Sequence, residues 1–351
     1  IPKILPESAQ FFRDTELFNE FVEYFYNYWR SFERYVICDS EGDTLDKRPY
    51  RTFNQTVEKL ADLVMGTYRD IQENITGTHP RIYRQLPAGA GVAAIGIPKN
   101  IPYPADSFSK LKDILIIRQM LLNPPVILDP PSNKRTGEFI KINENPMDIV
   151  NLNPADWICY PARVGRLVIN IYFHESFYEL GFSLCNLFDI AGDGELERKP
   201  DAVYLFGVPG SELDRFGEVP AVFFDDRKND ILVAACPLRP MFGYFGYLKK
   251  MVLTLHNAVM IRNGMMPYHG AMVKVILKGG KEKTILLMGD SGAGKSETLE
   301  AFRNLGREHL RDMIIIADDM GSLELTPDGI TGYGTETGAF LRIDDLKPGY
   351  A

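Results

Sequence analysis

The sequence predicts an α/β protein with two parts: an N-terminal α/β domain, and a phosphate-loop (P-loop) nucleotide-binding domain with a mixed sheet. Two observations lead to this expectation. Residues 284–298 read TILLMGDSGAGKSET, which is an apolar run, a glycine-rich loop and the start of a helical pattern. Between residues 148 and 240, β-branched and aromatic runs lie between turn residues, a pattern typical of strands. We place the domains at residues 1–239 and 240–351, with a further internal boundary near residues 123–150.

The composition is that of an ordinary globular protein, and it narrows the function classes. A net charge of −8 argues against a nucleic-acid-binding surface. No stretch approaches eighteen consecutive apolar residues, so we expect no membrane span. The four cysteines show no C-x-x-C spacing, and the first residues lack the pattern of a signal peptide. We therefore expect a cytoplasmic protein with reduced thiols.

The first 140 residues show helical patterns separated by loop-rich stretches. Residues 7–34 carry aromatic side chains at three- and four-residue spacings, which predicts an amphipathic helix with an aromatic core face. A second helical pattern covers residues 52–74, and a third covers residues 108–122. Residues 87–105 are rich in proline and glycine and predict a loop. Residues 123–137, also proline-rich, mark either an internal boundary or an exposed loop.

Strands dominate the next hundred residues. The predicted strands cover residues 167–173, 202–206, 221–224 and 231–235. Just before the first of them, Arg163 and Arg166 follow a short proline-containing stretch. These arginines could bind an anionic substrate, or they could be solvated side chains beside a turn. The sequence leaves both interpretations open.

The glycine-rich loop carries the most specific chemical signal, because it satisfies the pattern G-x-x-x-x-G-K-[ST]. Glycines let backbone N–H groups approach phosphate oxygens, and the positive end of the following helix dipole faces the same anion. Lys295 is placed to neutralise the outer phosphates and Ser296 to ligate Mg²⁺. We expect ATP, or another nucleotide or phosphate donor, to bind here with Mg²⁺. The predicted nucleotide-binding residues are Gly289, Asp290, Ser291, Gly292, Ala293, Gly294, Lys295, Ser296 and Glu297.

The segments that flank the loop supply further polar residues. Residues 243–257 form a helical pattern, with Lys249 and Lys250 near its start, and residues 271–277 predict a strand. After the loop, the apolar run at residues 313–317 predicts a buried strand that ends in Asp318 and Asp319. Acidic side chains at the carboxyl end of a strand beside a P-loop are placed to hold a metal ion. The alternative is that the two aspartates only cap the strand.

These motifs together resemble ATP-dependent phosphoenolpyruvate carboxykinase over about residues 240–346. Tyr244-Phe245-Gly246-Tyr247-Leu248-Lys249-Lys250 resembles the Y-x-G-E-M-K-K segment of that family, and His269 follows Lys250 at the family's spacing of nineteen residues. The loop resembles G-L-S-G-T-G-K-T, and Asp318-Asp319 resembles the start of D-D-E. Residues 336–344, ETGAFLRID, resemble the later E-G-G-C-Y-A-K-T-I-D segment.

The resemblance implies a catalytic site and a reaction. Lys250, His269 and Asp319 match the residues that hold a catalytic Mn²⁺, and Tyr244 matches a tyrosine that lies against the substrate. A lysine ligates a metal only as the neutral amine, so its pKa would have to fall. The implied reaction converts oxaloacetate and ATP to phosphoenolpyruvate, ADP and CO₂. The expected catalytic residues are Lys250, His269, Lys295, Asp318 and Asp319, and the expected metal ligands are Lys250, His269, Ser296 and Asp319.

A second resemblance leaves the substrate open. His269-Gly270, the loop at 289–297 and Asp318-Asp319 are even more similar to bacterial HPr kinase/phosphorylase, in which the first aspartate acts as a base towards a serine of a carrier protein. The arginine-containing G-R-S-P-K-D-K segment of the carboxykinases has no clear counterpart here, and we expect the nucleotide-binding domain to be incomplete at its C-terminus. Three functions stay open: a carboxykinase-like enzyme, a kinase for a serine or small molecule, and a non-catalytic nucleotide-binding module.

Overall fold

The structure is a computed structural model, and contacts within it divide the chain into two compact units. The first unit comprises Ile1–Ile97 and Arg118–Ile127, and the second comprises Pro98–Ile117 and Leu128–Ala351. The boundary expected between residues 239 and 240 therefore falls within the second unit. The structure describes residues 6–31, 35–39, 47–77, 92–122, 128, 130–132, 134–289, 295, 298–299 and 309–337.

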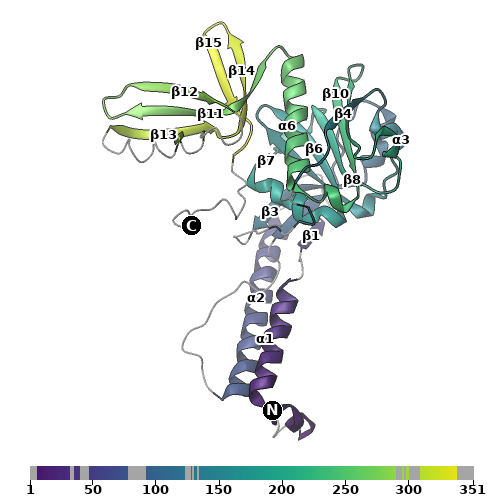
Figure 1. Cartoon of the computed structure of the whole chain (residues 1–351), viewed down its shortest axis with the longest axis vertical. Helices are drawn as coiled ribbons and strands as arrows, with labels where there is room; N and C mark the ends of the chain where they lie inside the picture. Colours follow the sequence, from purple (N-terminus) through teal and green to yellow (C-terminus); the bar gives the residue numbers. More distant parts are fainter. Residues whose placement is uncertain are drawn as a thin grey trace. The chain divides into compact units, whose positions relative to one another are not determined.

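The first unit contains a helical hairpin (Figure 1) formed by α1 (Thr15–Ser31) and α2 (Lys47–Thr76), after a 3₁₀ segment, η1 (Pro6–Phe12). The ring of Tyr26 stacks on that of Tyr68 at 4.0 Å, and the Glu23 carboxylate accepts hydrogen bonds from Tyr68 and Gln72. Glu23 of α1 reaches Gln72 of α2, whereas the later residue Tyr26 contacts the earlier residue Tyr68. The two helices therefore run antiparallel. The helix predicted over residues 52–74 is confirmed. The helix predicted over residues 7–34 is confirmed over α1, but η1 precedes it, and the expected aromatic core face is wrong in part because Phe21, Tyr24, Phe25 and Tyr28 are exposed.

The first unit also holds two strands, β1 (Tyr35–Asp39) and β2 (Val92–Ile97), which pair in parallel. The loop predicted over residues 87–105 is therefore wrong in part, because it contains β2. All six residues of β2 are buried. A parallel strand buried on both faces has a continuous apolar run without alternation. The glycines and prolines on either side of β2 favour a loop in a prediction from sequence, so the short apolar run between them is not recognised as a strand.

The second unit is built on a large mixed sheet. Its strands lie in the order β3 (Leu115–Leu122), β5 (Trp157–Val164), β6 (Leu167–His174), β8 (Ala202–Val208), β10 (Ile231–Pro237), β9 (Ala221–Asp226) and β4 (Phe139–Ile142), and β7 (Asp189–Ile190) pairs with β5. Only the first three residues of β3, which include those paired with β5, belong to this unit. The β5–β6 and β9–β10 pairs are antiparallel, whereas the β3–β5, β6–β8, β8–β10 and β4–β9 pairs are parallel. The expected α/β class is confirmed, but this mixed sheet is formed by strands before residue 240, whereas the sequence predicts a mixed sheet in the P-loop domain that follows.

The helix predicted over residues 108–122 is wrong. A 3₁₀ segment, η2 (Asp106–Leu111), is followed by strand β3. The isoleucines Ile114, Ile116 and Ile117 are fully buried in this region. Their β-branched side chains favour an extended backbone. A short apolar run is compatible with either a helix or a strand, and pairing with a neighbouring strand selects the strand here.

Short helical segments connect the strands of the large sheet, and one long helix packs against it. The short segments are α3 (Pro146–Ile149), η3 (Pro154–Asp156), η4 (Glu175–Phe177), α4 (Tyr178–Phe182), η5 (Ser183–Asn186), α5 (Asp193–Leu196), η6 (Asp214–Phe216) and η7 (Pro240–Phe242). The long helix, α6 (Phe245–Arg262), contacts β8 and β10. The Tyr204 hydroxyl on β8 donates a 3.3 Å hydrogen bond to the Tyr247 carbonyl, which fixes α6 on the sheet. Among the described residues, no helix is long and apolar enough to cross a bilayer.

A second, smaller sheet follows α6 (Figure 1) and carries the glycine-rich loop. Its strands lie in the order β12 (Glu282–Met288), β11 (Met266–Leu277), β14 (Met320–Thr326) and β15 (Gly329–Gly334), and β13 (Leu310–Ala317) pairs with β11. The pairings described within this sheet are antiparallel. The mixture of parallel and antiparallel pairs therefore lies in the large sheet.

Candidate functional site

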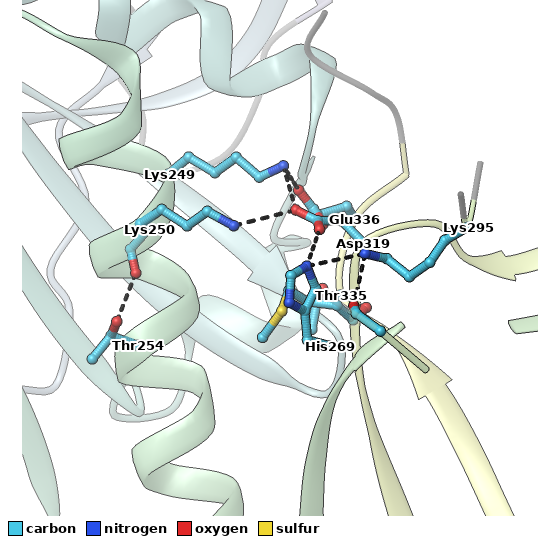
Figure 2. Close-up of polar contacts among 10 residues, drawn as sticks. Lys249, Lys250, Thr254, His269, Lys295, Asp319, Thr335 and Glu336 are labelled. Atoms are coloured by element: carbon cyan, nitrogen blue, oxygen red, sulfur yellow. Dashed lines mark hydrogen bonds and ion pairs between the residues drawn. The ribbon is translucent and has the colours of Figure 1, made fainter. Parts of the chain in front are cut away.

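Polar side chains from five separate segments of the second unit meet beside the smaller sheet (Figure 2). Helix α6 carries Lys249 and Lys250, strand β11 carries His269, and the turn between β13 and β14 carries Asp319. Lys295 follows the glycine-rich loop, and Glu336 follows β15. We call these six residues the Asp319 cluster. Its members come from positions up to 87 residues apart, so tertiary packing alone brings them together.

Asp319 is the centre of this cluster. Its Oδ1 lies 2.9 Å from Nε2 of His269, and its Oδ2 lies 3.0 Å from Nζ of Lys249 and 3.4 Å from Nζ of Lys250. Burial alone would raise the pKa of this carboxyl, but the two lysines and His269 more than offset that effect and lower the pKa to about 2. Asp319 is therefore an anion at neutral pH, as a metal ligand must be.

Lys249 is the most firmly held cation of the cluster. Its Nζ lies 2.7 Å from Oε1 of Glu336, in addition to its contact with Asp319. The Lys249 and Glu336 side chains are only 15% and 4% exposed. Burial alone would lower the pKa of Lys249, but the two carboxylates outweigh it and raise the pKa above its ordinary value. Burial raises the pKa of Glu336 despite the nearby ammonium group. Lys249 is thus a fixed positive charge.

Lys250 is placed differently, although it is the next residue. Its side chain is 43% exposed, and its Nζ forms an ion pair with Asp319 at 3.4 Å. Its carbonyl accepts a 2.8 Å hydrogen bond from the Thr254 hydroxyl, one turn further along α6. An exposed amine near an aspartate and a histidine is accessible to a ligand, whereas the buried Lys249 is held by two carboxylates.

The ends of the glycine-rich loop are tied to the same place. Nζ of Lys295 donates a 2.8 Å hydrogen bond to the Gly289 carbonyl and lies 3.4 Å from Nε2 of His269. The Gly289 amide in turn donates to the His269 carbonyl at 3.3 Å. The expected nucleotide-binding residues Asp290, Ser291, Gly292, Ala293, Gly294, Ser296 and Glu297 lie outside the described residues. Lys295 is therefore the loop residue that the structure places in the Asp319 cluster.

Two glycines allow the strands around the cluster to approach closely. A Cβ atom on Gly270 would lie 2.5 Å from the Leu287 carbonyl oxygen, and one on Gly334 would lie 1.8 Å from that of Ile316. The Gly270 amide also donates a 2.9 Å hydrogen bond to the Asp319 carbonyl. This bond joins the backbone beside His269 to the backbone of Asp319, so the two side chains start from adjacent positions.

Other expected site residues are placed elsewhere. Arg163, on β5, pairs with Asp189 at 2.6 Å. Arg166 pairs with Glu324 at 2.6 Å, and its guanidinium lies over the Tyr333 ring. Both arginines thus have acidic partners of their own.

Two further expected residues lie near the cluster in sequence. Tyr244 is the N-cap residue of α6, where its ring lies beside Gly246. Asp318 lies half-buried between β13 and β14, next to Asp319.

Lys249 and Glu336 are the residues that sequence reasoning did not assign to the site. From the sequence, Lys249 is only the neighbour of Lys250 in a predicted helix and has no role of its own. In the structure, Lys249 is the buried member of the pair and has a raised pKa. Glu336 begins the stretch that resembles E-G-G-C-Y-A-K-T-I-D, and this resemblance is the sequence feature that could have assigned Glu336 to the site. A lone glutamate after a strand gave no reason to expect a buried ion pair.

The donor set is compatible with a divalent cation bound by Lys250, His269 and Asp319. The three side chains meet at Asp319, and one of them is a firm anion. Ligation through Nε2 of His269 would require the tautomer protonated at Nδ1. Within the described part of the chain, no group of three histidine, cysteine or acidic side chains is arranged to hold a metal. A metal site here therefore depends on Lys250 as a neutral amine or on residues outside that part.

A scan against models of known protein families finds no match to this chain, and a search of curated proteins finds none either. The resemblance to phosphoenolpyruvate carboxykinase and to HPr kinase rests on the motifs quoted above, and it stays a prediction.

Proposed function

We propose that this protein is a nucleotide-dependent phosphotransferase of the phosphoenolpyruvate carboxykinase type, acting on oxaloacetate and ATP to form phosphoenolpyruvate, ADP and CO₂. The supporting observation is that Lys250, His269, Lys295 and Asp319 meet in one cluster. The P-loop pattern singles out Lys295, and the carboxykinase resemblance singles out the other three. A chance match to a P-loop pattern gives no reason for its lysine to lie beside a histidine and an aspartate from other strands.

The proposed roles follow from charge and position. Lys295 binds the outer phosphates of the nucleotide, and Ser296 ligates its Mg²⁺. Lys250, His269 and Asp319 hold Mn²⁺, which when bound would stabilise the enolate left by loss of CO₂. Lys249 stays protonated and supplies a fixed positive charge near the reacting groups. The ammonium groups of Lys249 and Lys295, together with a bound Mn²⁺, would outweigh the carboxylates of Asp319 and Glu336 (Figure 2), which suits a phosphate-bearing ligand.

The finer architecture belongs to the same proposal. The small sheet and α6 form a carboxykinase-like nucleotide-binding domain, and residues 1–239 form the substrate side. Tyr244, at the N-cap of α6, then lies against the organic acid.

A second candidate function is an HPr-kinase-like enzyme that phosphorylates a serine or a small-molecule hydroxyl. The ion pairs of Arg163 with Asp189 and of Arg166 with Glu324 favour it. A dicarboxylate such as oxaloacetate requires cationic partners, and these arginines are already paired. In this alternative, Asp318 accepts the proton of the hydroxyl group and Lys295 again binds the phosphates.

A coupled assay tests the first proposal. The chain is incubated with oxaloacetate, ATP, Mg²⁺ and Mn²⁺, and phosphoenolpyruvate is measured, in parallel with the variants Lys250→Ala and Lys283→Ala. Lys283 is an exposed lysine on β12 and serves as the matched control. Product that is lost in Lys250→Ala and kept in Lys283→Ala supports the carboxykinase activity.

The negative outcomes separate the alternatives. ATP binding without phosphoenolpyruvate, but with transfer of ³²P to a serine peptide or small hydroxyl compound, would support the kinase. Binding without transfer to any acceptor would leave a non-catalytic nucleotide-binding module. Absence of ATP binding in the folded chain would contradict all three.

A further inference from the structure

Helix α1 has an inner face and an outer face that are both apolar. On the inner face, Phe18 contacts the rings of Phe11 and Phe12, and Tyr26 stacks on Tyr68 of α2. This face is therefore covered within the hairpin. A surface helix with one partner ordinarily needs only one apolar stripe.

The outer face carries five large apolar side chains, which we call the outer seam. Each of them is between 53% and 71% exposed. They are Leu17, Phe21, Tyr24, Phe25 and Tyr28. Four of the five follow the alternating four- and three-residue spacing of a heptad, which is the pattern by which one helix packs against another. The seam is already ordered, because Phe21 stacks on Phe25 and Tyr24 on Tyr28 with nearly parallel rings.

The exposed apolar area is large enough for a stable association. An aromatic side chain offers about 150–250 Å². Four aromatic side chains and Leu17, each more than half exposed, therefore present about 500 Å² on one copy. Two copies would bury about 1,000 Å², the size at which specific interfaces begin. Patches of this size mark interaction sites on monomeric proteins.

We propose that the outer seam is a dimer interface, in which α1 packs antiparallel against α1 of a second copy. The four helices then lie side by side, with the two α1 helices at the centre and an α2 helix on the far side of each. The spacing favours this partner because the seam is self-complementary. A two-fold axis between residues 22 and 23 places Leu17 opposite Tyr28 and Phe21 opposite Tyr24, so every large side chain of the heptad meets another.

The charges on α1 support the antiparallel arrangement over two alternatives. Glu16 and Glu20 are exposed at the N-terminal end of the helix beside the seam. A parallel pair would place these carboxylates next to their own copies, whereas an antiparallel pair separates them to opposite ends. The same carboxylates disfavour an anionic membrane surface, which attracts basic rather than acidic helices.

The test uses the full chain and measures its mass by light scattering and its dissociation constant by sedimentation. The wild type should be a dimer. Phe21→Lys and Tyr24→Glu should each raise the dimer dissociation constant at least tenfold, because each buries a charge opposite an aromatic ring. Mixing the two variants should restore a heterodimer, because residue 21 of one copy faces residue 24 of the other. Asp70→Lys is the matched control. Asp70 is an exposed residue of α2 between Tyr68 and Gln72, which contact α1, and its substitution should not affect the dimer.

Several outcomes would overturn the proposal. A monomeric wild type would do so, and so would a dimer that persists in Phe21→Lys. Recovery on mixing Phe21→Lys with Phe21→Glu, but not with Tyr24→Glu, would replace the antiparallel arrangement by a parallel one. Binding of a monomer to vesicles of phosphatidylcholine and phosphatidylserine would assign the seam to membranes. If the charged variants fail to fold by circular dichroism, oxidation of a mixture of Phe21→Cys and Tyr24→Cys chains decides, because the antiparallel dimer predicts a cross-link between residues 21 and 24 that either chain alone lacks.

Discussion

The ammonium group of Lys249 lies 2.7 Å from the carboxylate of Glu336, and both side chains are almost completely buried. The same ammonium group lies 3.0 Å from Asp319. Lys249 therefore joins α6 to the turn after β13 and to the segment after β15. This arrangement fixes the positions of two carboxylates beside the glycine-rich loop, and it makes the Lys249–Glu336 pair a structural element of the candidate site.

The first prediction concerns this pair. We expect Glu336→Gln to lower the free energy of unfolding by about 1–3 kcal/mol, because it removes a charge-assisted contact from a buried lysine. Urea denaturation measures the change. Glu282→Gln is the control, since Glu282 forms a surface ion pair with Lys274 and should show little change. Equal stability of Glu336→Gln and wild type would contradict the proposed role of the pair.

The second prediction concerns the pH dependence of stability. The pKa of Asp319 is about 2 in the folded protein, below its ordinary value of 3.8. A lowered pKa stabilises the folded state at pH values above 3.8, and this stabilisation is lost as the pH falls towards 2. It amounts to about 2 kcal/mol. Asp319→Asn should therefore be less stable than wild type at pH 6, and the difference should shrink between pH 4 and pH 2. A difference that is constant over this range would show that the pKa is not lowered.

The third prediction separates nucleotide binding from the rest of the site. Lys295→Ala should weaken the binding of ATP with Mg²⁺ by about 10- to 100-fold, because a charge-assisted hydrogen bond to phosphate contributes about 1.5–3 kcal/mol. Isothermal titration calorimetry measures the affinity. Lys283→Ala, the exposed lysine on β12, should bind as tightly as wild type. A similar loss in both variants would mean that Lys295 acts only through overall charge.

The fourth prediction concerns the metal. Lys250→Ala and His269→Ala should each weaken Mn²⁺ binding by at least tenfold and leave ATP affinity within about threefold of wild type. Electron paramagnetic resonance of free Mn²⁺ gives the metal affinity. Arg163→Ala is the control, because Arg163 pairs with Asp189 outside the Asp319 cluster. Unchanged Mn²⁺ affinity in both variants would exclude the carboxykinase-type metal site.

The fifth prediction concerns the backbone beside the cluster. Gly334→Ala should reduce the free energy of unfolding by about 1–3 kcal/mol, since the added Cβ would lie 1.8 Å from the Ile316 carbonyl oxygen and β15 would have to shift. Gly279→Ala is the matched control, because no atom lies within 4 Å of a Cβ there. Because Glu336 follows β15 directly, Gly334→Ala should also reduce the effect of a second substitution, Glu336→Gln. Thermal unfolding of the single and double variants measures both effects.

Much of the local structure could be predicted from the sequence, and the exceptions have a common cause. The helices near residues 7–34 and 52–74, the strands from 167 to 235 and the strand before the glycine-rich loop all carry clear periodicity or clear boundaries. β2 and β3 do not, because both are short apolar runs that become strands only when neighbouring strands pair with them. A long-range pairing of this kind leaves no local signal.

The sequence by itself determined that this chain carries a glycine-rich loop between a strand and Lys295, and it singled out Lys250, His269 and Asp319, because motifs of this kind are local and depend on residue type and spacing. Only the tertiary structure decided that these side chains meet, that Lys249 rather than Lys250 is the buried lysine, and that Arg163 and Arg166 pair elsewhere. The physical reason is that burial and ion pairing depend on which segments pack together. Two adjacent lysines with the same chemistry thus differ because one side of α6 faces Glu336 and the other remains open to solvent.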